Sequence, residues 1–244
     1  MINHGPIEEL ASVDSTNAEA MRRVQAGEQG PLWILAEKQD SGRGRSGRGW
    51  SSEPGNLHAS LVVTLAAPQP KAYQLALVAG VAVFDAIAAS VHPTIPGLSL
   101  KWPNDIMIDG TKAGGILIES SLGSGRLAAV IGIGLNVETS PGQLDRPTTH
   151  LRAHGTCPPP AELLGYIADA MARWLATWDE GRGFDAVREA WLNRAHPLGE
   201  RLSVNSGAEL ATGTFQGLDA EGALLLQVGG DVRRFTFGDV TLAR

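Results

Sequence analysis

The feature that most limits how this chain can fold is a polar ten-residue run, Asp40 to Gly49, directly before Trp50. It contains four glycines and three arginines and no apolar side chain, so it cannot contribute to a hydrophobic core. Glycine lets backbone N–H groups approach a ligand closely, and arginine supplies a permanent charge with a planar donor group. The composition therefore predicts a loop that binds an anion such as a phosphate or a carboxylate.

Gly42, Gly44 and Gly47 have the spacing of a dinucleotide-binding loop, but the residues that follow them exclude that fold. A Rossmann unit needs a helix to begin inside the glycine pattern, so that the helix N-terminus meets the pyrophosphate. Here Pro54 and Gly55 follow closely, and no long helix can start. The alternative is a solvated loop or an RGG-like RNA contact. The net charge of −6 and the position between two apolar strands disfavour it.

Strands and helices are mixed along most of the chain without strict alternation, which favours an α+β fold over a doubly wound sheet. Strands are predicted at Leu32–Ala36, Leu57–Leu65, Leu98–Trp102 and Leu127–Val137, with a hairpin from Ile106 to Glu119 that turns at Asp109-Gly110. Helices are predicted from Thr16 to about Ala26, Ala72–Val91, Ala161–Trp178 and Phe184–Ala195. A capping box with Thr16 as the cap and Glu19 three residues later is expected to begin the first helix.

The chain changes character after His196-Pro197, where short strand-like segments alternate with glycine turns. These segments are Arg201–Val204, Leu210–Gln216, Ala223–Val228, Arg233–Phe237 and Val240–Leu242. The pattern is typical of a small five-stranded barrel. The sequence therefore predicts two domains, a mixed-sheet domain with packed helices at residues 1–196 and a small β domain at residues 197–244.

The amino-acid composition indicates the cellular compartment and the classes of binding partner. The chain has 244 residues, of which 43% are hydrophobic and 19% charged, which is the composition of a globular protein. Its sequence pI near 5.5 disfavours non-specific binding to nucleic acid or anionic membranes, although a local basic patch is compatible with it. Its one cysteine, Cys157, excludes an intramolecular disulfide and fits a reducing compartment. No signal peptide is evident, and Asp85 near the centre of Ala72–Val91 favours a core helix over a membrane span. We expect a cytoplasmic protein with no nucleic-acid or membrane partner.

Four further motifs accompany the glycine–arginine run, and each has a plain structural explanation when taken alone. They are Ser15-Thr16-Asn17, Lys101-Trp102-Pro103-Asn104-Asp105, Lys112-Ala113-Gly114-Gly115-Ile116-Leu117 and Gly132-Ile133-Gly134-Leu135-Asn136-Val137. A helix start, a polar turn, a solvated lysine and a strand softened by glycine would account for them separately.

In this combination and order, the five motifs strongly resemble biotin–protein ligases, also called biotin–[acetyl-CoA-carboxylase] ligases or holocarboxylase synthetases. The motifs extend from Asp14 to Val137, over half of the chain, and the C-terminal β domain looks like the SH3-like domain of that family. Some family members carry a DNA-binding domain ahead of Ser-Thr-Asn. Only 14 residues precede Ser15 here, so we expect the ligase-only type without that domain.

The resemblance implies a two-step reaction. The biotin carboxylate attacks the α-phosphate of ATP to give biotinyl-5′-AMP and pyrophosphate, and a lysine of a biotin carboxyl carrier protein then takes the biotinyl group and releases AMP. ATP, biotin and Mg²⁺ are the expected ligands, with magnesium held mainly through phosphates and no protein ligand assigned. A lipoate or octanoate ligase of the same superfamily is the alternative enzyme, and a non-enzymatic biotin-binding regulator is the alternative of another class.

The resemblance also implies residue roles. Biotin binding is expected at Ser15, Thr16, Asn17, Gln39, Arg43, Gly44, Arg45, Lys112, Gly114 and Gly115. ATP and adenylate binding is expected at Arg43, Arg45, Arg48, Trp50, Asn104, Asp105, Lys112 and Asn136. The expected catalytic residues are Lys112, Arg45, Arg48 and Asp105. The glycine–arginine run is expected to be mobile in the empty protein and to close over the ligands, and Asp105 is expected to hold the acceptor lysine.

Overall fold

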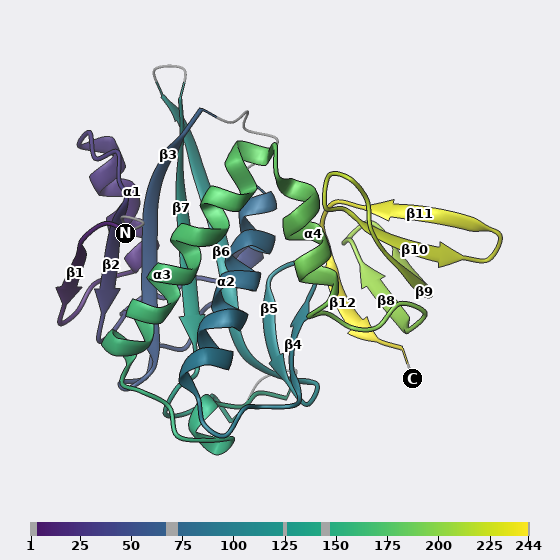
Figure 1. Cartoon of the computed structure of the whole chain (residues 1–244), viewed down its shortest axis with the longest axis horizontal. Coiled ribbons are helices and arrows are strands. Elements are labelled where there is room, and N and C mark those ends of the chain that lie inside the picture. The colour runs from purple at the N-terminus through teal and green to yellow at the C-terminus, as the bar shows by residue number, and fades with distance from the viewer. Residues whose placement is uncertain (1–3, 67–72, 124–125, 143–146, 244) are drawn as a thin grey trace.

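A computed structural model of the chain describes residues 4–66, 73–123, 126–142 and 147–243. Figure 1 shows a large mixed sheet with helices packed on it and a smaller antiparallel sheet at one end of the molecule. The α+β class and the C-terminal β unit predicted from the sequence are therefore confirmed. No helix in these four ranges is long and apolar enough to cross a membrane.

The large sheet has seven strands in the spatial order β1-β2-β3-β7-β6-β5-β4. β1 and β2 are parallel, and the other neighbouring strands are antiparallel. The strands are β1 (Ile7–Leu10), β2 (Leu32–Ala36), β3 (Leu57–Leu65), β4 (Leu98–Lys101), β5 (Asp105–Ile108), β6 (Thr111–Gly123) and β7 (Arg126–Leu135). Long β6 and β7 occupy the middle of the molecule, which explains why motifs on them can meet residues from both ends of the chain.

One face of this sheet is covered by α2 (Gln74–Ser90) and α3 (Pro160–Trp178), and α4 (Phe184–Leu192) packs on these helices beside the C-terminal sheet, as Figure 1 shows. Leu57, Leu61 and Ile131 are among the strand residues that face these helices, because alternate side chains of a strand point to the same side. α2 is almost entirely buried, which confirms the core helix expected in Ala72–Val91, although Ala72 lies outside the described residues.

The opposite face is covered by α1 (Thr16–Gln25), which packs on Leu32, Ile34 and Val62. The expected capping box is wrong. Ser15 is the N-cap residue and makes no side-chain capping bond, and Thr16 is already helical. Glu19 instead forms ion pairs with arginines of the next turn. The Thr16 hydroxyl has a partner outside the helix, so tertiary contacts override the local capping pattern.

The predicted hairpin is present, with β5 and β6 joined by Asp109 and Gly110. Both turn residues have positive φ, 48° and 73° respectively, as a two-residue type I′ turn requires. Beyond the turn, a β-bulge at Ala113 shifts the pairing by one residue, so that Asp105 on β5 lies opposite Gly115 on β6. The hairpin with its bulge sets this register. It therefore brings the Lys-Trp-Pro-Asn-Asp and Lys-x-Gly-Gly motifs together.

The C-terminal unit is an antiparallel sheet in the order β11-β10-β9-β8-β12. Its strands are β8 (Arg201–Asn205), β9 (Leu210–Leu218), β10 (Leu224–Val228), β11 (Asp231–Phe235) and β12 (Asp239–Leu242). β11 begins and ends two residues earlier than the predicted Arg233–Phe237, because the Gly229-Gly230 turn pairs Asp231 with Val228 directly. The indole N–H of Trp102 donates to the carbonyl of Gly222 at 3.1 Å and ties the unit to the large domain.

Truncating Trp178 should strongly destabilise the packing of the helices on the sheet. Trp178 is 1% exposed, and its indole N–H donates to Gln74 Oε1 at 2.8 Å. We expect Trp178→Ala to lower the free energy of unfolding by about 3–5 kcal/mol. Tyr166→Ala, on the same helix but 42% exposed, should cost about 0.5 kcal/mol or less. Urea unfolding measures both, and equal losses would contradict this packing.

Candidate active site

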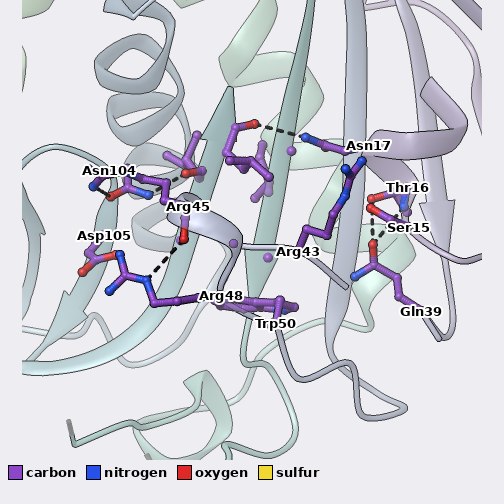
Figure 2. Close-up of a pocket in the computed structure, with 18 of the residues that line it drawn as sticks. Ser15, Thr16, Asn17, Gln39, Arg43, Arg45, Arg48, Trp50, Asn104 and Asp105 are labelled. Atoms are coloured by element: carbon purple, nitrogen blue, oxygen red, sulfur yellow. Dashed lines mark hydrogen bonds between the residues drawn. The ribbon is translucent and has the colours of Figure 1, made fainter. Parts of the chain in front are cut away.

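One pocket collects residues from the start of α1, the glycine–arginine loop, the turn after β4, strands β6 and β7, and β12 of the C-terminal unit. It is lined by all the predicted site residues except two. Gly114 faces Leu135 beside the pocket, and the side-chain amide of Asn136 donates to the carbonyl of Thr149 at 2.9 Å, so neither lines it. Figure 2 shows the Thr16–Gln39 pair at one end and Asn104 and Asp105 at the other, with the loop between them.

The Thr16 end of the pocket is a network of neutral hydrogen-bonding groups. The backbone N–H and the hydroxyl of Thr16 both donate to Gln39 Oε1, at 2.9 and 3.1 Å. Gln39 in turn donates to Ser52 Oγ at 2.9 Å. Because these groups both donate and accept, they can rearrange around a small neutral ligand that carries carbonyl and N–H groups.

Two residues that the sequence analysis missed, Ser60 and Glu119, complete this network. The Ser60 hydroxyl lies 2.8 Å from Thr16 Oγ1 and 2.6 Å from Asn17 Oδ1. The Asn17 amide donates to Glu119 Oε2 at 2.8 Å. Ser60 could have been found from its place in β3, since it is a polar residue on the face where Val62 packs against α1. Glu119 lies on β6 two residues after the Lys-x-Gly-Gly-Ile-Leu motif, and nothing in the sequence around it indicated a binding residue.

The glycine–arginine loop folds back on itself as a narrow hairpin. The N–H of Gly44 donates to the carbonyl of Arg48 at 2.7 Å, and the N–H of Trp50 donates to the carbonyl of Gly42 at 2.9 Å. A short 3₁₀ turn, Arg45–Gly47, forms the tip, where Ser46 and Gly47 have positive φ of 55° and 73°. The backbone therefore closes its own hydrogen bonds and leaves the three arginine side chains to make other contacts.

Each arginine of the loop contacts an acceptor on a different element. Arg43 Nη2 lies 3.7 Å from Glu119 Oε2. Arg45 donates to Asn104 Oδ1 at 2.9 Å and to the carbonyl of Gly238 at 3.1 Å. Arg48 pairs with Asp239 at 2.9 Å. Figure 2 shows the three side chains spread along the pocket rather than bundled together. The loop thus presents positive charge along the length of the pocket.

The Trp50 ring lies flat on the sheet, over the glycines of β6 and β7. A Cβ at Gly134 would lie 2.5 Å from a ring atom of Trp50, and one at Gly115 would lie 3.4 Å from another. Lys112 Nζ is 5.7 Å from the ring centroid, a cation–π distance. Glycine is therefore required at position 134 to make room for the indole, and the indole connects the loop to Lys112.

Asp105 is buried between two lysines. Lys112 Nζ donates to Oδ1, and Lys101 Nζ lies 3.0 Å from Oδ2. Burial alone would raise the pKa of Asp105, but Lys112 and Lys101 together outweigh it and hold this pKa below its usual value. Asp105 is therefore a carboxylate at neutral pH.

The charges of the pocket indicate what it can bind. Arg43, Arg45, Arg48 and Lys112 all line it, so it can neutralise several negative charges brought close together. Within the described ranges, no group of three or more His, Cys, Asp or Glu side chains has the arrangement of a metal site. A polyphosphate beside a second anion matches the cationic end, and a small uncharged ring matches the Thr16 end. Fold and site together define a pocket that can hold a carboxylate and phosphate groups side by side.

The chain belongs to the biotin/lipoate A/B protein ligase family, whose model matches residues 10–136. Residues 198–242 match the biotin protein ligase C-terminal domain. The chain is 40% identical over 225 residues to the biotin–[acetyl-CoA-carboxylase] ligase of Paracoccus denitrificans, covering 89% of this chain and 92% of the relative. It is 30% identical over 244 residues to the enzyme of that name in Mycobacterium tuberculosis, covering 96% and 88%.

A solved structure with a similar fold is the biotin protein ligase from Aquifex aeolicus in complex with biotin and ATP. It matches with a TM-score of 0.79 and 27% identity, and 98% of each chain is covered. The likeness includes the C-terminal unit, so both parts of the chain share the arrangement found in that ligase.

Replacing Gly134 by alanine should displace Trp50 and open the loop. The added methyl group would meet the indole at 2.5 Å, and the ring is the part that can move. We expect trypsin to cut at Arg43–Arg48 several times faster in Gly134→Ala than in the parent protein. Gly142→Ala is the matched control, because a Cβ there has nothing within 4 Å. Cleavage at the parent rate in Gly134→Ala would show that Trp50 does not hold the loop.

Asp105→Asn should destabilise the protein in a pH-dependent way. Removing one partner of a buried ion pair costs about 3–5 kcal/mol, so the variant should be that much less stable at pH 7. Because the pKa of Asp105 is lowered in the folded protein, its contribution is present above the unfolded value of about 3.9 and is lost as the pH falls further.

The difference in the free energy of unfolding between the parent and Asp105→Asn should therefore become smaller below about pH 4. Urea unfolding at a series of pH values measures it. Asp231→Asn, at an exposed position, should show no such difference. A difference in unfolding free energy that stayed constant down to pH 2 would contradict the ionised state of Asp105.

Proposed function

We propose that this chain is an ATP-dependent biotin–protein ligase that joins biotin to a lysine of a carrier protein through biotinyl-5′-AMP. The observation that carries the proposal is the two-ended pocket. A neutral network around Thr16 and Gln39 suits the ureido ring of biotin, and the cations Arg43, Arg45, Arg48 and Lys112 suit a carboxylate beside a triphosphate. The ligase names of its relatives agree with this reading.

In the first step two anions must approach each other, and like-charge repulsion is the main obstacle. Fixed cations beside the reacting oxygens reduce this repulsion. Lys112 is the central residue, because its ammonium group lies in the pocket between Asp105 and the Trp50 ring. It leaves Asp105 for the biotin carboxylate and the α-phosphate, while Arg45 and Arg48 hold the phosphates beyond. Trp50 is placed to stack beside the adenine.

Magnesium enters as the counter-ion of ATP and adds positive charge at the phosphates. It needs few protein ligands when it is bound through a triphosphate. We assign no protein side chain to the metal, because the two carboxylates that line the pocket, Asp105 and Asp239, are each paired with a cation.

In the second step Asp105 receives the acceptor lysine of the carrier. A free lysine has a pKa of about 10.4, so its neutral, nucleophilic form is scarce at pH 7. Once Lys112 has moved to the phosphate, one oxygen of Asp105 is open to the incoming ammonium group, and Lys101 still holds the other. A carboxylate in this position orients the amine and helps to take its proton.

The acceptor is the biotin carboxyl carrier domain of acetyl-CoA carboxylase or a related carboxylase. We assign adenylation to residues 1–196 and assign residues 197–244 to the SH3-like unit, which reaches the pocket through Gly238 and Asp239. We assign Asn136 and Gly114 a supporting role, because Asn136 donates to the carbonyl of Thr149 and Gly114 packs closely against Leu135 of the neighbouring strand.

The discriminating experiment incubates the protein with ATP, magnesium, an apo carboxyl carrier domain and either biotin or lipoate, followed by detection of the label. We expect biotin to appear on the carrier and to require ATP. Transfer of lipoate but not biotin would indicate a lipoate ligase of the same family. Biotin binding without ATP turnover would indicate a regulator rather than an enzyme.

Lys112→Ala and Asp105→Asn should separate the two steps. We expect Lys112→Ala to slow adenylate formation by about 10²-fold or more, as loss of a charge-stabilising group does. Asp105→Asn should impair transfer from preformed biotinyl-AMP to the carrier more than it impairs adenylate formation. Arg126→Ala, exposed at the start of β7, is the control for lost positive charge. Slow adenylation with normal transfer in Asp105→Asn would exclude the acceptor role.

The glycine–arginine loop should become less accessible when the ligands bind. Closure over the pocket would shield the hydrolysable acyl phosphate from water. We expect biotin plus ATP to slow tryptic cleavage at Arg43–Arg48 several-fold. Cleavage at Arg126, which is exposed far from the pocket, provides the internal reference. Equal rates with and without ligands would refute closure.

A further inference from the structure

Asp239 is a carboxylate in a pocket that we assign to phosphates, and no motif of the ligase resemblance contains it. It is the first residue of β12 in the C-terminal unit and lines the pocket beside the loop. An acid here opposes the binding of any polyanion, so its presence calls for an explanation.

The position of Asp239 is fixed by its own sheet. Asp239 pairs with Asn205 of β8, and Val240 after it is buried. Gly238 before it has φ of 147°, and a Cβ there would lie 3.0 Å from Val204 and 3.1 Å from the carbonyl of Asn205. Glycine is needed at this position, and it lets the carbonyl of residue 238 accept from Arg45 while the next side chain reaches Arg48.

The contact between Asp239 and Arg48 is weak enough for a phosphate to replace the carboxylate. Arg48 Nη2 and Asp239 Oδ1 are 2.9 Å apart, and the two side chains are 44% and 50% exposed. Ion pairs this exposed are weak, so an incoming phosphate can displace the carboxylate. A guanidinium group binds phosphate and carboxylate through the same donors, so the two compete for one partner.

We propose that Asp239 is a built-in competitor for pyrophosphate. It pairs with Arg48 when that part of the pocket holds no phosphate, yields to the β- and γ-phosphates of ATP, and pairs again as pyrophosphate leaves after the adenylate has formed. The C-terminal unit thus sets how tightly the leaving group is held. The inference rests on the proposed function, in which Arg48 contacts the pyrophosphate.

Direct binding of pyrophosphate tests this competition without any ligation step. Equilibrium dialysis with radiolabelled pyrophosphate and Mg²⁺, but no biotin or ATP, would compare the parent protein with Asp239→Asn. Asparagine keeps the size of the side chain and removes its charge. We expect the dissociation constant to fall about two- to fivefold, the range for an exposed ion pair. Asp231→Asn, an exposed acid of the same sheet, should leave it unchanged.

A second pair of proteins shows whether the effect acts through Arg48. In an Arg48→Gln background, adding Asp239→Asn should give no tightening, because the shared partner is gone. Unchanged or weaker pyrophosphate binding in Asp239→Asn would overturn the proposal, as would equal tightening in Asp231→Asn or in the Arg48→Gln background. Absence of measurable binding to the parent would also overturn it, whereas failure of the proposed function appears separately as absence of biotin on the carrier.

Discussion

The buried pairing of Asp105 with Lys101 and Lys112 is the interaction on which the site depends. It places two positive charges and one negative charge in the interior, where unpaired charges are costly. The cluster exists because the Asp109-Gly110 turn and the bulge at Ala113 set the register of β5 against β6. It holds Lys112 in position when no ligand is present, and in the proposed reaction a ligand phosphate or carboxylate takes the place of Asp105.

Exchange of a protein acceptor for a ligand anion also explains the contacts of the loop arginines. The loop arginines rest on acceptors from three different elements: Glu119 on β6, Asn104 in the turn after β4, and Gly238 and Asp239 at β12. These contacts hold an intrinsically flexible glycine-rich segment in place and hold the C-terminal unit against the large domain. In the proposed function a polyanionic ligand competes for the same donors, and we infer that ligand binding, loop position and contact between the two units are coupled.

The sequence predicted most of the fold because alternating apolar patterns and glycine turns are local signals. The hairpin at Asp109 and the buried strand β3 are examples. It also predicted which motifs converge, since their order resembled a known family. It could not give contacts such as Arg48 with Asp239, which are 191 residues apart and depend on how the C-terminal unit docks. The capping box failed for the related reason that the Thr16 hydroxyl bonds to Gln39 across the fold.

A crystal structure with biotinyl-5′-AMP bound would test the exchange of anions most directly, through the distances from Lys112 Nζ to Asp105 and to the phosphate. The account predicts that the ammonium group lies within hydrogen-bond distance of a phosphate or carbonyl oxygen of the ligand, with Asp105 still held by Lys101. A Lys112 that remained on Asp105, with the phosphate bound elsewhere, would contradict it.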